Sequence, residues 1–357
     1  MATLTPITGT LGITRAKHLL QRFTFSANRA TIQQFAALTA ESAFDLLTAT
    51  LPEPEPPIDP KTGATWLNPK PDPIINSEDF KLFDYYEAWH LEIMRKSGVN
   101  ITERMVWFLH THFPVQRSIV SSTAEVYYQN KLFRKYALGN FKELFIKMIT
   151  DNAMLRYIDN NQNEVNSPNE NFARELLELY SIGKGEQVGA DDYTNYTELD
   201  VKIAARVLTG FKNDSEFANL DPDTQLPRAI LKTDNNKRAY LHDAGIKTFS
   251  ARFAEKSVTP NEIVNGYVTE TAVFDELQQM ISLIFEQPET AKFLVRKLYR
   301  QFVFYKISAE VETDIIVPLA ELFATEKFEL LPVLRKLILS QHFFDEDTAL
   351  PENKRNG

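Results

Sequence analysis

The segment from Ser167 to Gly183 has the most strongly punctuated helix pattern in the chain. Ser167 can cap the first turn while the Glu170 side chain reaches back to it, and Pro168 suits the first helical position, where an N–H group would have no partner. Gly183 can end the helix in a left-handed conformation. At 100° per residue, the apolar side chains fill one broad arc, which comprises Phe172, Ala173, Leu176, Leu177, Leu179 and Tyr180. The pattern therefore predicts an amphipathic helix whose apolar side faces a core.

The opposite arc of this predicted helix carries Asn171, Arg174, Glu175 and Glu178. One interpretation is a solvated face, on which Arg174 pairs with the acidic residues one turn away on either side. The other is a face that lines an internal polar cavity, where Glu175 and Glu178 could share a proton or chelate a metal ion. Spacing alone leaves both interpretations open.

Most of the remaining chain also shows helical periodicity, which predicts a mainly α-helical fold. The predicted helices cover residues 14–23, 31–47, 78–96, 102–113, 124–136, 141–150, 198–208, 273–285, 288–304, 312–323 and 330–339. Two stretches interrupt this pattern. Residues 52–73 hold eight of the 18 prolines, so we expect an irregular Pro-rich surface loop there, anchored by Trp66. Residues 212–259 are rich in Asn, Asp, Pro and Gly, and we expect a loop-rich insertion with one small β-hairpin.

Composition narrows the class of function. The chain has 357 residues and a formal net charge of −9, which disfavours sequence-independent binding to nucleic acid or to an anionic membrane. It has no cysteine, so disulfides and thiolate chemistry are excluded, and a metal ion would need His, Asp or Glu ligands. The sequence has no apolar run long enough to span a membrane, and its N-terminus lacks the features of a signal peptide. As written it indicates a cytoplasmic protein, whereas a chain trimmed of its leader would be periplasmic or secreted.

A second group of candidate residues surrounds two histidines. Asn100-Ile101-Thr102-Glu103 is a capping-box pattern, and Pro114 would stop the helix that contains His110 and His112. On a regular helix these histidines point about 200° apart, so they could bind one metal ion only if the helix unwinds just before Pro114. The alternative is structural, with one histidine near the negative end of the helix dipole and the other packed under aromatic rings.

A third group is the turn from His242 to Thr248, which places His242, Asp243 and Lys247 around Gly245. Loops of this kind often display functional side chains, but an Asp-capped hairpin turn explains the same pattern. Residues 197–200 form a helix-start box for which a structural role suffices. Serine-hydrolase, Walker, Rossmann and His-Glu-x-x-His motifs are absent from the sequence.

Taken in chain order, these patterns resemble the large bacterial family catalogued as domain of unknown function 1800. The segment Asn169-Glu170-Asn171-Phe172-Ala173-Arg174-Glu175-Leu176, with Gly183, carries most of the resemblance. Further matching segments are His18-Leu19-Leu20 with Arg22, residues 103–105, 110–113, 157–160, 196–200 and 205–210, His242-Asp243 with Gly245 and Lys247, and residues 290–298. Leu109, Thr111 and Phe211 depart from what looks typical of the family, but no ionisable group is lost. Because the resemblance spans nearly the whole chain, it implies one continuous helical domain over residues 1–357.

The family pattern includes the charged arc and both histidines, so the resemblance favours a polar interior site. Its candidate metal ligands, for a divalent ion, are His110, His112 and Glu178. Its candidate catalytic groups are Arg174, Glu175, His242 and Asp243, with Glu103 and Asn171 nearby. The first hypothesis is therefore an enzyme of metal-assisted hydrolysis or oxidation, in which Arg174 orients an anionic substrate group.

The rival hypothesis is a non-catalytic accessory or binding protein. In this case a buried ion network fixes the arrangement of the helices, and the Pro-rich loop contacts a partner protein. The resemblance implies a candidate partner, because members of the family are often encoded beside another uncharacterised family that looks like sulfatases and alkaline phosphatases. Members are also often exported.

Overall fold

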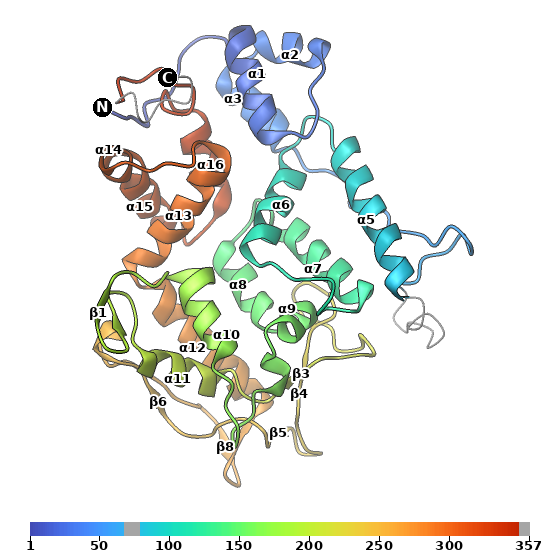
Figure 1. The fold of residues 1–357 in the computed structure, drawn as a ribbon, viewed down its shortest axis with the longest axis vertical. Helices are drawn as coiled ribbons and strands as arrows, with labels where there is room; N and C mark the ends of the chain where they lie inside the picture. The colour runs from blue at the N-terminus through green and yellow to red at the C-terminus, as the bar shows by residue number, and fades with distance from the viewer. Residues whose placement is uncertain (68–78, 350–357) are drawn as a thin grey trace.

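Helices make up about half of the computed structural model, which describes residues 1–67 and 79–349 (Figure 1). The N-terminal part contains α1 (Gly12–Phe23), α2 (Arg29–Ala36), α3 (Ala40–Leu47), α5 (Asp79–Lys96), α6 (Thr102–His112), α7 (Thr123–Tyr136), α8 (Phe141–Ile149) and α9 (Asn152–Tyr157). The rest contains α10 (Asn171–Glu175), α11 (Glu198–Val207), α12 (Glu270–Phe285), α13 (Pro288–Phe302), α14 (Ala309–Val311), α15 (Val317–Thr325) and α16 (Leu330–Ile338). The predicted mainly α-helical fold is confirmed. Over the described ranges, none of the helices has the length and apolar character needed to cross a membrane.

Short antiparallel ribbons fill the loop-rich part of the chain. β3 (Phe211–Lys212) pairs with β4 (Ile230–Leu231), and β6 (Lys247–Thr248) pairs with β7 (Ser257–Val258). Further along, β8 (Ile263–Val264) and β9 (Tyr267–Thr269) form a hairpin, and β5 (Arg238–Ala239) extends it to three strands. The β structure is thus more extensive than the single hairpin expected in residues 212–259. An additional ribbon, β1 (Gln187–Gly189) with β2 (Asp192–Tyr193), follows the charged helix.

The hairpin between β8 and β9 turns at Asn265-Gly266. Both residues have a positive φ, 52° and 83°. Asn-Gly is the favoured pair for two-residue hairpin turns that need this conformation at both positions. The turn lies outside residues 212–259, where the hairpin was expected.

The charged helix differs from its predicted form at both ends. It begins at Asn171 rather than at Pro168, because the Asn169 side chain caps the Asn171 N–H group at 2.9 Å. Buried Asn163 in turn accepts the Asn169 N–H group at 2.9 Å and holds the preceding residues in a turn. After Glu175 the chain continues as a π-helix, η2 (Leu176–Ser181). The wider π turn moves Leu179 out of the predicted apolar arc, and its side chain is 46% exposed.

Two apolar cores lie inside the molecule. The main core connects helices from α1 to α16. The smaller core lies beneath the Pro-rich segment, which is irregular over residues 52–67, and it is built around Trp66, Leu82, Tyr86 and Tyr127. Trp66 is 5% exposed, and its Nε1–H group donates to Thr123 Oγ1 at 3.0 Å. The predicted anchor is therefore confirmed, while residues 68–73 of the predicted loop lie outside the described residues.

The first and last described segments lie side by side (Figure 1). The Ile7 N–H group donates to Leu339 O at 2.9 Å, and the Gln341 N–H group donates to Thr5 O at 2.8 Å. Beyond them, the Met1 ammonium group donates to Thr348 O at 2.9 Å. The two ends of the described chain therefore close on each other through backbone hydrogen bonds.

We expect Trp66→Ala to lower the free energy of unfolding by about 3–5 kcal/mol, because it empties a buried aromatic site and leaves the Thr123 hydroxyl without its indole donor. Trp107→Ala is the matched control, since the Trp107 side chain is 40% exposed. Urea denaturation of both variants measures the difference. Equal losses in the two variants would contradict the anchoring role of Trp66.

Candidate functional site

The charged arc of α10 and η2 faces α11 rather than an internal cavity. Arg174 donates to both carboxylate oxygens of Glu198, at 2.5 and 2.7 Å, and a third contact joins it to Glu170 at 3.4 Å. The Arg174 side chain remains 34% exposed. The arrangement lies between the two interpretations of the sequence, because the arc is partly solvated but its main ion pair reaches another helix. The contact of Arg174 with Glu170 was predicted, whereas its main partner, Glu198, was not.

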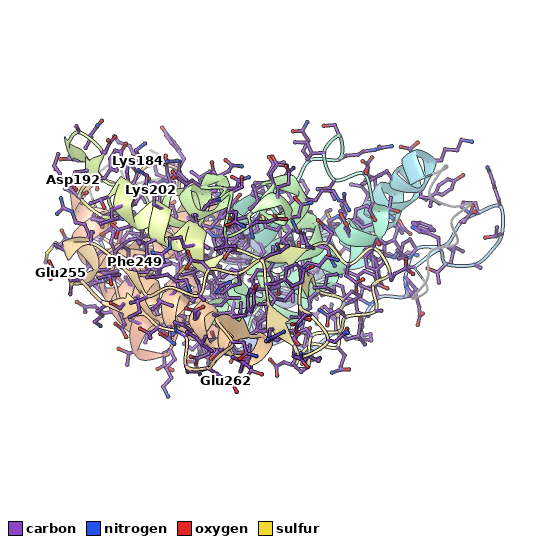
Figure 2. The ribbon with its side chains drawn as sticks, turned by 90° about the horizontal axis from the view of Figure 1, so that it is seen from below. Lys184, Asp192, Lys202, Phe249, Glu255 and Glu262 are labelled. Atoms are coloured by element: carbon purple, nitrogen blue, oxygen red, sulfur yellow. The ribbon has the colours of Figure 1, made fainter. Side chains whose placement is uncertain are left out.

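Glu175 and Glu178 follow Arg174 on the same face. Burial and the nearby Glu178 carboxylate raise the pKa of Glu175, and over residues 1–67 and 79–349 its carboxylate accepts no hydrogen bond. Glu178 instead accepts the Tyr196 hydroxyl at 2.9 Å and lies 3.6 Å from the Lys184 ammonium. Lys184 lies on the upper side of the molecule in Figure 2, so this face opens to solvent. The two carboxylates are close enough to interact, but only that of Glu178 holds hydrogen-bonding and ionic partners among the described residues.

His112 lies between three helices with both ring nitrogens occupied. Its Nε2–H group donates to Tyr180 O of η2 at 2.9 Å, and its Nδ1 accepts from the Lys297 ammonium of α13 at 3.2 Å. Burial and the Lys297 charge hold the pKa of His112 well below 6.5. The ring is therefore a neutral connector of α6, η2 and α13. Lys297 also donates to Leu179 O at 2.7 Å, so it holds the end of the π-helix.

His110 points away from this connector. Both histidines belong to α6, which stays helical through His112, so the unwinding that would have aligned them does not occur. His110 packs edge-on against the Phe133 ring of α7, and burial lowers its pKa. Neither imidazole is hydrogen-bonded to Glu175 or Glu178 within the described part of the chain. The expected pocket shared by these histidines and glutamates is therefore not formed.

Glu103 belongs to an ion pair instead of the capping box suggested by the sequence. Its carboxylate is 3% exposed and accepts two hydrogen bonds from Arg134 of α7, at 2.7 and 2.9 Å. The helix start is capped by Asn100, whose side chain accepts the Thr102 N–H group at 2.9 Å. Over the described ranges, no three His, Asp or Glu side chains are grouped as metal ligands. His110, His112 and Glu178 as placed here do not fit a divalent metal.

The most deeply buried charges surround Glu276 of α12. The Glu276 carboxylate contacts His242 Nε2 at 2.6 Å through one oxygen and the Lys247 ammonium at 2.6 Å through the other. All three side chains are fully buried, with 0% exposure. On the other side of the ring, His242 Nδ1 lies 2.9 Å from Thr209 O and 3.3 Å from the Thr209 hydroxyl, so both ring nitrogens have polar partners. Burial lowers the pKa of Lys247, although the ion pair with Glu276 opposes this effect.

Asp243 continues this network toward the surface. Its carboxylate accepts two hydrogen bonds from Arg206 of α11, at 2.7 and 3.1 Å, and one from the Gly245 N–H group at 2.7 Å. Burial disfavours its ionisation, but the bonds from Arg206 and Gly245 outweigh this effect and lower the pKa of Asp243. A Cβ atom at Gly245 would lie 2.7 Å from Arg206 Nη2, so the guanidinium occupies the space that a larger residue would need. The predicted turn thus uses each of its charged residues in an ion pair.

The sequence interpretation missed Glu276 and Lys297. Glu276 lies among Val273, Leu277 and Met280 on the apolar face of α12, and a single carboxylate in that position indicates a buried partner. Lys297 stands among the residues that carry the family resemblance, but no local pattern connects it with His112, 185 positions away. The sequence could therefore have singled out Glu276 and Lys297 as unusual positions, but it could not have indicated which residues they contact.

A cavity of about 330 Å³ lies between the Pro-rich segment and α7. We call it the Pro-rich groove, and its lining residues are Glu53, Pro54, Glu55, Pro56, Thr65, Leu67, Tyr127, Tyr128 and Lys131. The Tyr128 hydroxyl donates to Leu67 O at 3.0 Å, and Trp89 Nε1–H donates to Glu55 O at 2.8 Å. These bonds hold one wall of the groove against the helices. Nothing in the sequence pattern indicated the groove, because its two walls are 60 to 78 positions apart along the chain.

Glu276→Gln should lower the free energy of unfolding by about 3–5 kcal/mol, because it leaves the buried Lys247 ammonium without its carboxylate. The matched control is Glu198→Gln, which removes the partner of the partly exposed Arg174 and should cost about 0–1 kcal/mol. Adding Lys247→Met to Glu276→Gln should recover part of the loss, since no buried ammonium then remains. Urea unfolding measures all three variants, and similar losses for the two glutamates would refute the buried network as the main support.

We expect His112 to stabilise the folded protein at neutral pH. This contribution should be lost as the pH falls below about 6.5, the ordinary pKa of histidine. In this range the unfolded imidazole binds a proton while the folded one stays neutral because its pKa is lowered, so acid favours unfolding. Nitrogen NMR of the imidazole should show the neutral Nε2–H form at pH 7 and still at pH 5.5. A titration of His112 with a midpoint near 6.5 in the folded protein would disprove the assignment.

The comparison with known proteins identifies one family. A sequence model described as "Protein of unknown function (DUF1800)" matches residues 18–355. No curated protein and no solved structure matches the chain. The family description assigns no activity to the ion pairs or to the groove. Because the match covers nearly the whole sequence, the chain belongs to the DUF1800 family of proteins of unknown function.

Proposed function

We propose that this protein is a non-catalytic accessory protein that binds a partner through the Pro-rich groove. The observation that carries the proposal is the complete burial of His242, Lys247 and Glu276, at 0% side-chain exposure. A substrate cannot reach these groups in the folded protein, although His242 belongs to the strongest candidates for chemistry in the sequence. These side chains pair with one another and stabilise the packing of the elements around them.

The other charged residues of the family pattern support the same proposal. Arg174 is paired with Glu198, Asp243 with Arg206, and Glu103 with Arg134, each through two hydrogen bonds. Bidentate pairs of this kind fix the orientation of the elements that carry them. A group that must act on a substrate would first have to break such a pair.

The Pro-rich groove has the properties of a binding surface. Its volume of about 330 Å³ falls in the range of small-ligand pockets, and it combines two tyrosine rings with exposed carboxylates. Prolines stiffen the wall formed by residues 53–56, so little conformational entropy is lost when a ligand binds there. The candidate partner is the sulfatase- and phosphatase-like protein of the uncharacterised family that the sequence resemblance implies.

Acid–base catalysis is the second candidate, and one observation favours it. Glu175 has a raised pKa, lies beside Glu178 at a partly exposed position, and directly precedes a π-helix. Segments of π-helix are frequent at functional sites, and a carboxylic acid with a raised pKa suits proton transfer near neutral pH. This candidate uses the carboxylate pair without a metal ion, because the side chains placed here offer no ligand set.

We expect Thr65→Trp to block partner binding, because the indole would fill the groove that Thr65 lines. Thr62→Trp is a close control, since each threonine hydroxyl accepts a backbone N–H group two residues ahead, at 3.2 Å for Thr65 and 3.3 Å for Thr62. Titration calorimetry with the purified sulfatase- and phosphatase-like protein should show a complex that Thr65→Trp weakens at least about tenfold, or about 1.4 kcal/mol, and that Thr62→Trp leaves unchanged.

Two results would overturn the proposal. One is the absence of a complex with this partner, and the other is a complex that both tryptophan variants form equally well. A hydrolytic activity of the wild-type protein that Glu175→Gln abolishes would then favour the second candidate.

A further inference from the structure

The Pro-rich groove carries more negative than positive charge. Glu53 and Glu55 face it from one wall and Lys131 from the other, and Lys131 is already paired with Glu53 at 2.7 Å. Burial raises the pKa of the Tyr127 phenol to about 12, and the negative charges of Glu53 and Glu55 add to the shift. Both carboxylates therefore act on the same point inside the groove. One negative charge, that of Glu55, remains without an ion-pair partner in the described residues.

The hydrogen-bonding groups of the groove are mainly acceptors. Pro54 and Pro56 have no N–H group, so the extended wall offers carbonyl and carboxylate oxygens at these positions. The Lys131 ammonium is a donor, but it is engaged by Glu53. Because Glu55 O and Leu67 O already accept hydrogen bonds from Trp89 and Tyr128, the acceptor that remains for a ligand is the Glu55 carboxylate, which suits a cation rather than an anion.

The aromatic rings complete the site. Tyr127 and Tyr128 line the groove with their ring centroids 5.3 Å apart and their planes inclined by 71°. Tyrosine rings attract ammonium and guanidinium groups through their negatively charged faces. Tyr127 is buried and also packs against Trp89, so half-buried Tyr128 is the more accessible ring for an organic cation beside the unpaired Glu55 carboxylate.

We propose that the Pro-rich groove binds a basic side chain, the ammonium group of lysine or the guanidinium group of arginine, presented by a segment of the partner protein. The inference rests on the proposed accessory function and adds the chemistry that the partner must offer. The cationic head lies against Glu55 and the tyrosine rings, and the aliphatic stem follows Pro54 and Pro56.

The test uses the full chain and two peptides that differ in one side chain. The probes are Ac-Ala-Ala-Lys-Ala-Ala-amide and the same peptide with norleucine in place of lysine, titrated by NMR into protein labelled with nitrogen-15. We expect the lysine peptide to shift the backbone N–H signals of Glu53, Glu55 and residues 127–131, and the norleucine peptide to bind more weakly. Added salt should weaken the binding of the lysine peptide, because its contact with the protein is a partly exposed charge pair.

Three variants set the direction of the effect. Glu55→Gln should lower the affinity for the lysine peptide about two- to fivefold, as expected for the loss of one exposed ion pair. It leaves the Trp89 anchor intact, since that bond goes to the Glu55 backbone oxygen. Lys131→Met should strengthen binding, because it frees Glu53. Glu255→Gln is the matched control and should change nothing, because Glu255 lies at the left end of Figure 2, opposite the segments coloured blue to cyan.

The inference fails if the norleucine peptide binds as well as the lysine peptide, or if Lys131→Met weakens binding, which would indicate an anionic ligand. Failure of the proposed function is a separate result, because it appears as an unchanged partner complex in Thr65→Trp. A complex that Thr65→Trp disrupts, together with no preference for lysine, would keep the groove as the partner site and remove the basic side chain as its ligand.

Discussion

A single buried carboxylate, that of Glu276, connects three separate parts of the molecule. It belongs to α12 and accepts hydrogen bonds from His242 and from Lys247, the first residue of β6. His242 is in turn fixed by Thr209 O at the end of α11. The backbone at Gly210, which has a φ of +94°, passes close to the backbone of His242. A Cβ atom on Gly210 would lie 3.2 Å from the backbone nitrogen of His242. The packing of α11, α12 and the loop-rich insertion therefore depends on one fully desolvated set of charges.

The same principle recurs where other helices meet. Glu125 of α7 holds Arg156 of α9 through two hydrogen bonds, at 2.7 and 2.8 Å, just as Glu103 holds Arg134. Capping boxes and buried acids such as Asp200, which accepts both the N–H group and the hydroxyl of Ser250, add further fixed points. A chain with many short helices and ribbons has few long apolar faces to align them. Directional ion pairs between charged residues supply that alignment.

The sequence allowed the helices to be predicted wherever their signals were local. α6 was predicted at residues 102–113 and spans Thr102–His112, and α8 was predicted at 141–150 and spans Phe141–Ile149. The box at Thr197 and Asp200 is present as predicted, because both of its members lie within one turn. The start of α10 and the exposure of Leu179 were mispredicted, since Asn163 and the π turn act from outside the local pattern.

Pairings across long stretches of chain could not be predicted. The partner of His242 is 34 positions away, and that of His112 is 185 positions away. Periodicity gives the side of a helix on which a residue lies, but it does not give the element that this side meets. For this reason the candidate residues are spread over several ion pairs, some buried and some partly exposed, and within the described residues they do not assemble into one metal site.

The closure of residues 1–7 on residues 339–348 has a consequence for synthesis. A chain made from its N-terminus can form α1 to α3 early, but the backbone hydrogen bonds from Ile7 and Thr5 need acceptors and donors that are made more than 300 residues later. Until residues 339–341 have been made, Thr5 and Ile7 lack these partners. Contacts of such long range slow folding, so we expect residues 5–7 to pair with residues 339–341 late in assembly.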